Sequence, residues 1–162
     1  MKTRIRLLAL LAAVCLIFCG CAVEDQIVTA DELTITVPGD YIDCSAEDYA
    51  AGYTLVYGSK NGAVMVLKES RAAFEEYGLS DMTAQDYVQL LKEGYQLNLV
   101  TEEADGMVTF KFENEGNTYL AGVFASDNAF WMIQAGCPTA DFADQEETFR
   151  GILDSVSFKP NN

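Results

Sequence analysis

Apolar and polar residues alternate along much of the chain, which is the pattern of half-buried β-strands. Over residues 33–37 every second residue is apolar, and Pro38-Gly39 then ends the run. The apolar runs at 53–57 and 63–67 flank a Gly-Ser-Lys-Asn-Gly segment, whose Asn-Gly step is typical of a hairpin. Further strands, separated by turn-type residues, are predicted over 97–101, 107–112, 119–124, 130–133 and 156–158.

Three segments have helical periodicity instead. Residues 83–86 read as a capped helix start, the apolar residues Val88 and Leu91 follow on one face, and Gly94 ends the segment. A shorter helix is predicted over 70–77, and apolar residues recur at helical spacing after Pro138. Hairpins interrupted by one helix and closed by another predict an α+β fold: one domain over 31–162, with an antiparallel sheet of six or seven strands covered by helices.

The N-terminus has the three parts of an export signal. Lys2, Arg4 and Arg6 precede an uncharged apolar run over 7–18, and small residues lead to Cys21. Twelve apolar residues are too few to span a bilayer as a helix. Residues 1–20 are therefore predicted to be a signal peptide, and the cysteine that follows indicates a lipoprotein signal peptide. The alternatives are a cleaved secretory signal without lipid attachment and an uncleaved signal anchor.

The end of this run resembles the bacterial lipobox, in which small residues before a cysteine allow cleavage and the thiol accepts diacylglycerol. Gly20 and Cys21 match it, whereas Phe18 replaces the usual aliphatic residue. The resemblance implies lipid attachment at Cys21, a polar tether over 21–30, and a location on the extracytoplasmic face of a bacterial cell membrane. Two or three acyl chains would make that anchoring stable.

The charge balance narrows the choice of partners. The chain has a formal net charge of −15, and removal of the leader leaves seven cations against 25 carboxylates, or −18. This charge repels nucleic acid and anionic lipid headgroups, so neither is expected to bind the mature surface directly. Solubility outside the cell explains the acidity more readily than an acidic recognition patch does.

The residue inventory excludes several kinds of chemistry. Histidine is absent, which excludes Ser-His and Cys-His nucleophilic sites and the His-based zinc motifs. The acidic turns at 102–105 and 113–117 carry oxygen ligands of the kind that calcium takes, but they lack the spacing of a calcium loop and are read as solvated turns. No catalytic residue, metal ligand or cofactor is predicted, and the protein is not expected to be an enzyme.

Three further residues have two interpretations each. Cys44 and Cys137 could form a disulfide in an oxidising compartment, but their spacing leaves pairing open. Trp131, between Phe130 and Met132, is either part of the core or part of an aromatic binding face, and packing in the core is favoured.

The order of elements, the opening Leu-Thr-Ile-Thr-Val-Pro-Gly-Asp-Tyr at 33–41 and the closing segment 149–158 together resemble the PsbP-like superfamily, which includes bacterial DcrB-type lipoproteins. The resemblance implies an α/β/α sandwich. Known members are binding or assembly proteins: one stabilises photosystem II and another binds a small GTPase. None of their contact residues can be matched here, so no functional residue is transferred.

These observations favour a membrane-anchored, non-catalytic module that binds or assembles another envelope protein, whose identity is open. The alternative is a lipoprotein that carries a small ligand or a divalent cation such as calcium, which requires a lined pocket or clustered carboxylates.

The predicted cleavage of the leader and lipid attachment at Cys21 can be tested directly. Mass spectrometry of protein recovered from native membranes should find residues 1–20 removed and Cys21 acylated. An unmodified residue 21, or a retained leader, would contradict the prediction.

Overall fold

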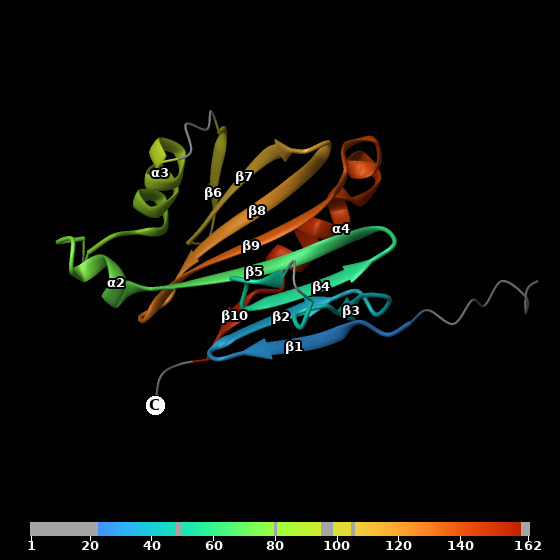
Figure 1. The fold of residues 1–162 in the computed structure, drawn as a ribbon, viewed down its shortest axis with the longest axis horizontal. Coiled ribbons are helices and arrows are strands. Elements are labelled where there is room, and N and C mark those ends of the chain that lie inside the picture. Colours follow the sequence, from blue (N-terminus) through green and yellow to red (C-terminus); the bar gives the residue numbers. More distant parts are fainter. Residues whose placement is uncertain (1–22, 48–49, 80, 95–98, 105, 160–162) are drawn as a thin grey trace, which may run out of the picture.

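The computed structural model describes residues 23–47, 50–79, 81–94, 99–104 and 106–159. Its centre is a seven-stranded antiparallel sheet with the order β3-β4-β5-β9-β8-β7-β6 (Figure 1). The strands are β3 (Ile42–Asp43), β4 (Leu55–Ser59), β5 (Gly62–Ser70), β6 (Thr101–Ala104), β7 (Met107–Asn114), β8 (Asn117–Ala125) and β9 (Ala129–Pro138). The predicted α+β class is confirmed.

A second sheet of three strands has the order β1-β2-β10, with β1 (Gln26–Ala30), β2 (Leu33–Val37) and β10 (Ser157–Phe158). The tether expected over 21–30 is therefore wrong for its second half, because residues 26–30 form a strand. Val28 is buried opposite Ile35, and the Gln26 side chain bonds to backbone oxygens of the segment after β2. One buried side chain in five residues is too weak a period-two pattern to be recognised in the sequence.

The helices are α2 (Arg71–Glu75), α3 (Ala84–Gly94) and α4 (Phe142–Asp154), the last preceded by a 3₁₀ turn over Thr139–Asp141. The predicted cap of α3 is confirmed: the Thr83 hydroxyl accepts the Asp86 backbone N–H at 3.2 Å, and the Asp86 carboxylate accepts the Thr83 N–H at 2.9 Å. These two bonds satisfy donors that a helix start leaves open. The hydrogen bonds that the Asp86 carboxylate accepts from the Thr83 backbone N–H and hydroxyl lower the pKa of Asp86.

Two strands differ from the prediction. The strand expected over 97–101 lies instead at Thr101–Ala104, directly before the turn to β7, because Ala104 pairs with Met107. Leu99 is buried although it lies outside any strand. Its apolar side chain therefore contributed to an apparent strand pattern in the sequence. The short strand β3 was not expected, since its two residues are both exposed.

The core lies on both faces of the large sheet. On one face, here called the α4 face, α4 and the three-stranded sheet pack against β5, β8 and β9. On the other, the α3 face, α2 and α3 pack around Phe130, whose ring stacks on Tyr87 at 4.9 Å. Trp131 is fully buried on the α4 face, which confirms its assignment to the core.

Glu32 links the two sheets. It follows β1, and its carboxylate accepts hydrogen bonds from the Trp131 indole N–H at 3.2 Å and from the Ser126 hydroxyl at 3.1 Å, while Lys68 lies 3.4 Å away. Burial would raise the pKa of Glu32, but the hydrogen bonds from its own backbone and from Ser126, together with Lys68, outweigh burial and lower it. The ionised form is therefore the one that stabilises the fold.

We expect Glu32→Gln to lower the free energy of unfolding by about 1–3 kcal/mol at neutral pH, since charge-assisted hydrogen bonds are weakened. A lowered pKa means that the stabilisation is complete above the ordinary value of 4.5 and is lost as pH falls through the folded-state value. Urea unfolding across pH should show the difference from wild type shrinking in acid. Glu147→Gln, on the exposed side of α4, is the control; equal effects of both variants would contradict the role of Glu32.

Candidate functional site

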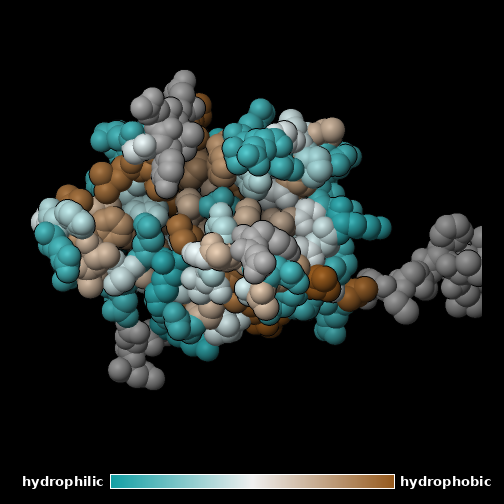
Figure 2. Space-filling model, in the orientation of Figure 1, coloured by the Kyte–Doolittle hydropathy of each residue, from teal (hydrophilic) through white to brown (hydrophobic). Residues whose placement is uncertain are grey.

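The helices leave part of the α3 face open. Helix α3 lies on β7 and β8, and α2 packs on β5 and β9, at the end of β5 that it follows. Among the described residues, no other helix packs on this face of the sheet. Figure 2 shows hydrophobic atoms among hydrophilic ones in the middle of this view.

The floor of this open region is set by strand register. Gly58, Ala63 and Gly136 are successive cross-strand partners on β4, β5 and β9, so three residues with little or no side chain lie side by side. Small residues in register leave a hollow in a sheet face, because no side chain rises from it. The next partner in the same row is Tyr119 on β8.

Tyr119 forms an aromatic wall with Phe112 of β7. Their rings are stacked, with centroids 4.8 Å apart and planes 11° from parallel. Gly136 makes room for this arrangement, because a Cβ at that position would lie 2.3 Å from a Tyr119 ring carbon. Burial, and secondarily the charges of Tyr53 and Glu115, raise the pKa of Tyr119, so its hydroxyl stays protonated.

The next row places one polar group in an apolar setting. Gln134 is the cross-strand partner of Met65 on one side and of Ala121 on the other. It is only 8% exposed, and within the described residues its amide forms no hydrogen bond. The buried side-chain polar atom that lacks a partner in the described part of the chain is the Tyr41 hydroxyl, so the Gln134 amide still reaches solvent. It can therefore both donate to and accept from a bound group.

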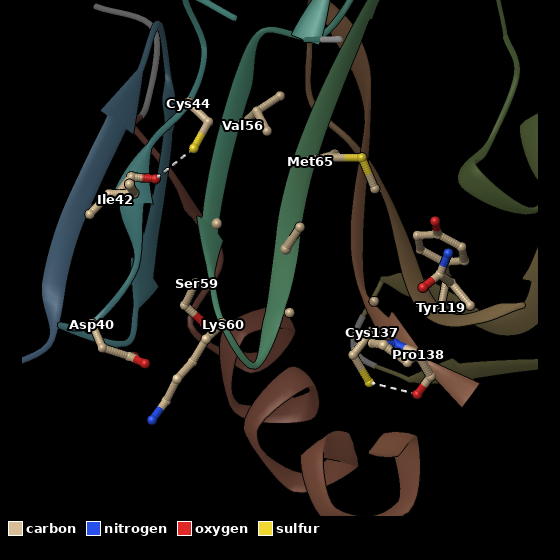
Figure 3. A pocket seen from close by; sticks show the side chains of 15 residues that line it. Asp40, Ile42, Cys44, Val56, Ser59, Lys60, Met65, Tyr119, Cys137 and Pro138 are labelled. Carbon is tan, nitrogen blue, oxygen red and sulfur yellow. Dashed lines mark hydrogen bonds between the residues drawn. The ribbon is translucent and has the colours of Figure 1, made fainter. Parts of the chain in front are cut away.

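Two adjoining pockets, of about 680 and 560 Å³, share Met65 and Tyr119 and together form what we call the sheet groove. Figure 3 shows the first of them. The first extends over the small residues to Asp40 and Ile42, and the second lies beside α3. The larger side chains lining the groove are Asp40, Ile42, Tyr53, Met65, Leu67, Glu69, Tyr87, Leu91, Phe110, Phe112, Glu113, Tyr119, Met132 and Gln134.

Charges stand at the margin of the groove. Glu69 accepts a hydrogen bond of 2.5 Å from the Tyr87 hydroxyl, which joins β5 to α3, and Glu113 and Asp40 line the two pockets. Lys60, on the turn between β4 and β5, lines the first pocket and carries a positive charge. The margin is thus acidic overall, and it suits a neutral or basic ligand better than an acidic one.

The structure separates the two cysteines. Cys44 bonds to Val56 of β4 and lies on the α3 face, next to Gly58, whereas Cys137 is in β9 and packs in the core of the α4 face. Strands β4 and β5 lie between them, which at about 4.8 Å per strand is roughly 14 Å, well beyond disulfide reach. Both are free thiols here, so the suggested disulfide is not formed. Burial, with a smaller contribution from Asp141, raises the pKa of Cys137.

Over the described ranges, which do not include Asp105 of the first acidic turn, no three cysteine or carboxylate side chains converge as metal ligands. Cys21 and the leader lie outside the described residues, so their predictions stay predictions. Across the same ranges, none of the helices has the length and apolar character required to traverse a bilayer.

The arrangement is suited to binding. Sequence reasoning missed Met65, Gln134 and Gly136 as site residues, because nothing in their type marks them. One signal was present: residues 63–67 are apolar at every position, although only Val64 and Val66 face the α4 core. An apolar run that covers both faces of a strand implies that its second face is also in contact with something.

No protein-family model and no curated protein sequence matches the chain. Solved structures do. The solution structure of cyanobacterial PsbP (CyanoP) from Synechocystis sp. PCC 6803 is 14% identical with a TM-score of 0.58, covering 88% of this chain and 96% of that one. A crystal structure from Bacteroides thetaiotaomicron VPI-5482 is 12% identical with a TM-score of 0.55, covering 84% of this chain and 49% of that one.

A third structure, LpqN, described as involved in cell envelope biogenesis of Mycobacterium tuberculosis, is 12% identical and covers 85% of this chain and 91% of that one, but its TM-score of 0.40 supports no conclusion. The first two establish a PsbP-like fold, as the sequence predicted. At these identities the similarity concerns the fold alone. Assignment to the DcrB-type branch stays a prediction.

The geometry of the groove depends on Gly136, which can be tested. We expect Gly136→Ala to displace the Tyr119 ring and to lower the free energy of unfolding by about 1–3 kcal/mol, the usual range for an added methyl in a packed site. Gly151→Ala is the matched control: it lies in α4 with open space around it, so it should stabilise by up to about 1 kcal/mol through helix propensity. Denaturant unfolding of both variants measures these changes. An unchanged free energy of unfolding in Gly136→Ala would show that the contact with Tyr119 is not tight.

Proposed function

We propose that this protein is a lipoprotein, held on the extracytoplasmic face of a bacterial membrane by a lipid on Cys21, that acts as a non-catalytic module binding another envelope protein through the sheet groove. The observation that carries the proposal is the open stretch of the α3 face, where small residues and Met65 form an apolar floor in a molecule whose other sheet face is covered.

Three features support a protein partner. The two adjoining pockets of the groove together cross several strands, which fits an extended segment better than a compact molecule. Its floor is apolar with one unpaired amide, Gln134, that could bond to a backbone peptide group. Its acidic margin would favour basic residues on the partner and would steer the encounter. The CyanoP-like fold is compatible with this role but does not specify it.

The alternative is a carrier of a small ligand. The observation that favours it is the same Gln134 amide, which lines one pocket together with the stacked Tyr119 and Phe112 rings and could fix the orientation of a planar molecule. The two roles differ in the mass of what is bound.

Site-specific photocrosslinking in the native envelope separates the two roles. A benzophenone amino acid replacing Leu67 in the groove should give an adduct heavier by the mass of a protein, whereas replacing Asp144, on the exposed side of α4, should not. If the two positions give the same adducts, or if Leu67 gives none, the groove is not the protein-binding surface.

A second substitution tests the floor of the groove. With the crosslinker at Leu67, Met65→Gln should reduce the adduct at least about fivefold, since an unpaired amide in an apolar contact costs about 1 kcal/mol or more. Thr148→Gln on the exposed side of α4 is the matched control, and melting temperatures confirm that both variants fold. An unchanged adduct with Met65→Gln would contradict the proposed surface.

A further inference from the structure

The second pocket of the sheet groove runs along the strands, beside α3. Two carboxylates line it, and each belongs to the residue before the last of its strand: Glu69 in β5 and Glu113 in β7. Strands β5 and β7 run in opposite directions, so these residues lie toward opposite edges of the sheet. The row of Phe112 and Tyr119 meets β5 at Ala63, six residues before Glu69. The pocket therefore extends about 20 Å along the strands, at about 3.3 Å per residue.

Aromatic rings line this pocket from two sides. Tyr119 and Phe112 are stacked on each other on β8 and β7, whereas Tyr53 precedes β4, on the other side of β5. Burial is the main cause of the raised pKa of Tyr119, and the charge of Tyr53 is close enough to contribute. All three side chains are only partly buried, so part of each ring is open to a bound group. Figure 3 shows Tyr119 and Met65, which both pockets share.

The lining of this pocket carries negative charge without positive charge. Among the described residues that line it there is no lysine or arginine, whereas Glu69 and Glu113 are both present. The Glu69 carboxylate accepts the hydrogen bond from the Tyr87 hydroxyl, which holds it beside α3. The chain as a whole has a formal net charge of −15. A cation is therefore attracted to this pocket and an anion is repelled.

Gln134 supplies a hydrogen-bond acceptor in the floor. Its cross-strand partners are Met65 and Ala121, which are apolar. Tyr119 is its diagonal neighbour, since Tyr119 pairs with Gly136, two residues further along β9. Diagonal neighbours in an antiparallel sheet are about 7–8 Å apart, a distance that a long side chain or a bound group can span. A group held against the Tyr119 ring can therefore also reach the Gln134 amide oxygen.

A guanidinium group satisfies the rings, the acceptor and the charge together. It is planar and weakly hydrated, it stacks on aromatic faces, and it only donates hydrogen bonds, whereas the ammonium group of lysine is compact and strongly hydrated. The α3 face already contains one such contact, because the Arg71 Cζ lies 4.4 Å from the centroid of the Phe130 ring. Arg71 is occupied there by hydrogen bonds to the backbone oxygens of Ser126 and Met82. None of the cation–ring contacts of the described residues involves Tyr119.

We propose that the second pocket receives an arginine side chain of the partner segment, with the guanidinium group stacked on the Tyr119 ring and donating to the Gln134 amide oxygen. This inference rests on the proposed function, since it names the residue by which the partner enters the sheet groove. Apolar neighbours of that arginine would lie on the floor formed by Met65, Leu67 and Met132.

Two peptides of the same shape isolate the effect of charge. The peptide Ac-Ala-Leu-Arg-Leu-Ala-NH2 is compared with its citrulline counterpart, in which a neutral urea replaces the guanidinium group. Each is titrated into the whole chain in dodecyl maltoside, and NMR follows the side-chain amide of Gln134. The arginine peptide should bind at least about fivefold more tightly at low salt, as expected for a cation over a partly desolvated ring. Sodium chloride should reduce this preference. Equal affinities would overturn the inference.

Single substitutions locate the cation. Glu69→Gln removes a charge from the pocket and Gln134→Met removes the acceptor, so each should reduce the preference for arginine at least about threefold. Glu147→Gln and Gln145→Met make the same changes on α4, which packs on the other face, and should leave the preference intact. Melting temperatures confirm that all four variants fold. If the α4 variants reduce the preference equally, the charge of the whole chain attracts the peptide and the inference is wrong.

Failure of this inference and failure of the proposed function are distinguishable. If both peptides shift the signals of Met65 and Leu67 with equal affinity, the groove binds a protein segment and only the arginine pocket is wrong. If tetramethylammonium chloride shifts the Gln134 amide and the arginine peptide does not, the ligand is a free small cation, which overturns the inference. If neither peptide binds, the inference fails, and the crosslink at Leu67 decides the proposed function on its own.

Discussion

The register of the large antiparallel sheet is the constraint on which both of its faces depend. Side chains alternate between faces, so the pairing that aligns Gly58, Ala63 and Gly136 on the α3 face also directs Val64 and Ala135 into the core of the α4 face. A slip of one residue would exchange the two sets, placing core residues in the groove and small residues under α4. The same strand register thus determines both the covered face and the hollow face.

The two faces have different tasks. The α4 face is covered by α4 and by the three-stranded sheet, and Glu32 joins that sheet to Trp131 and Ser126. The α3 face has its own core under α2 and α3, and it keeps an amide without a partner among the described residues and a stacked aromatic pair in the part that these helices leave uncovered. The covered part of each face stabilises the sheet, and the uncovered part of the α3 face carries the groove.

The position of the N-terminus relates the groove to the membrane. Residues 23–26 pack on the segment after β2, and the same segment supplies Asp40 and Ile42 to one end of the groove. A lipid anchor near this point would place the groove at the height of juxtamembrane segments of other envelope proteins.

Much of the architecture could be predicted, because local sequence patterns reflect interactions between residues that are close in the chain. The Thr83–Asp86 cap, the period-two strands and the burial of Trp131 follow from hydrogen bonding and alternation within a few residues. The tether boundary failed where a strand, β1, buries a single side chain, and the strand expected at 97–101 failed where Leu99 is buried outside a strand. The sequence left the pairing of Cys44 and Cys137 open, since the number of residues between two cysteines does not show which face of the sheet each one lies on.

By itself, the sequence determined the α+β class, the acidity of the chain and the absence of imidazole chemistry, because these depend on composition and on short-range periodicity. Only the tertiary structure decided that three small residues meet in one row, that Gln134 has no partner within the described residues, and that Cys44 and Cys137 lie on opposite faces. Those facts depend on strand order and register between segments far apart in the chain, which no local pattern specifies.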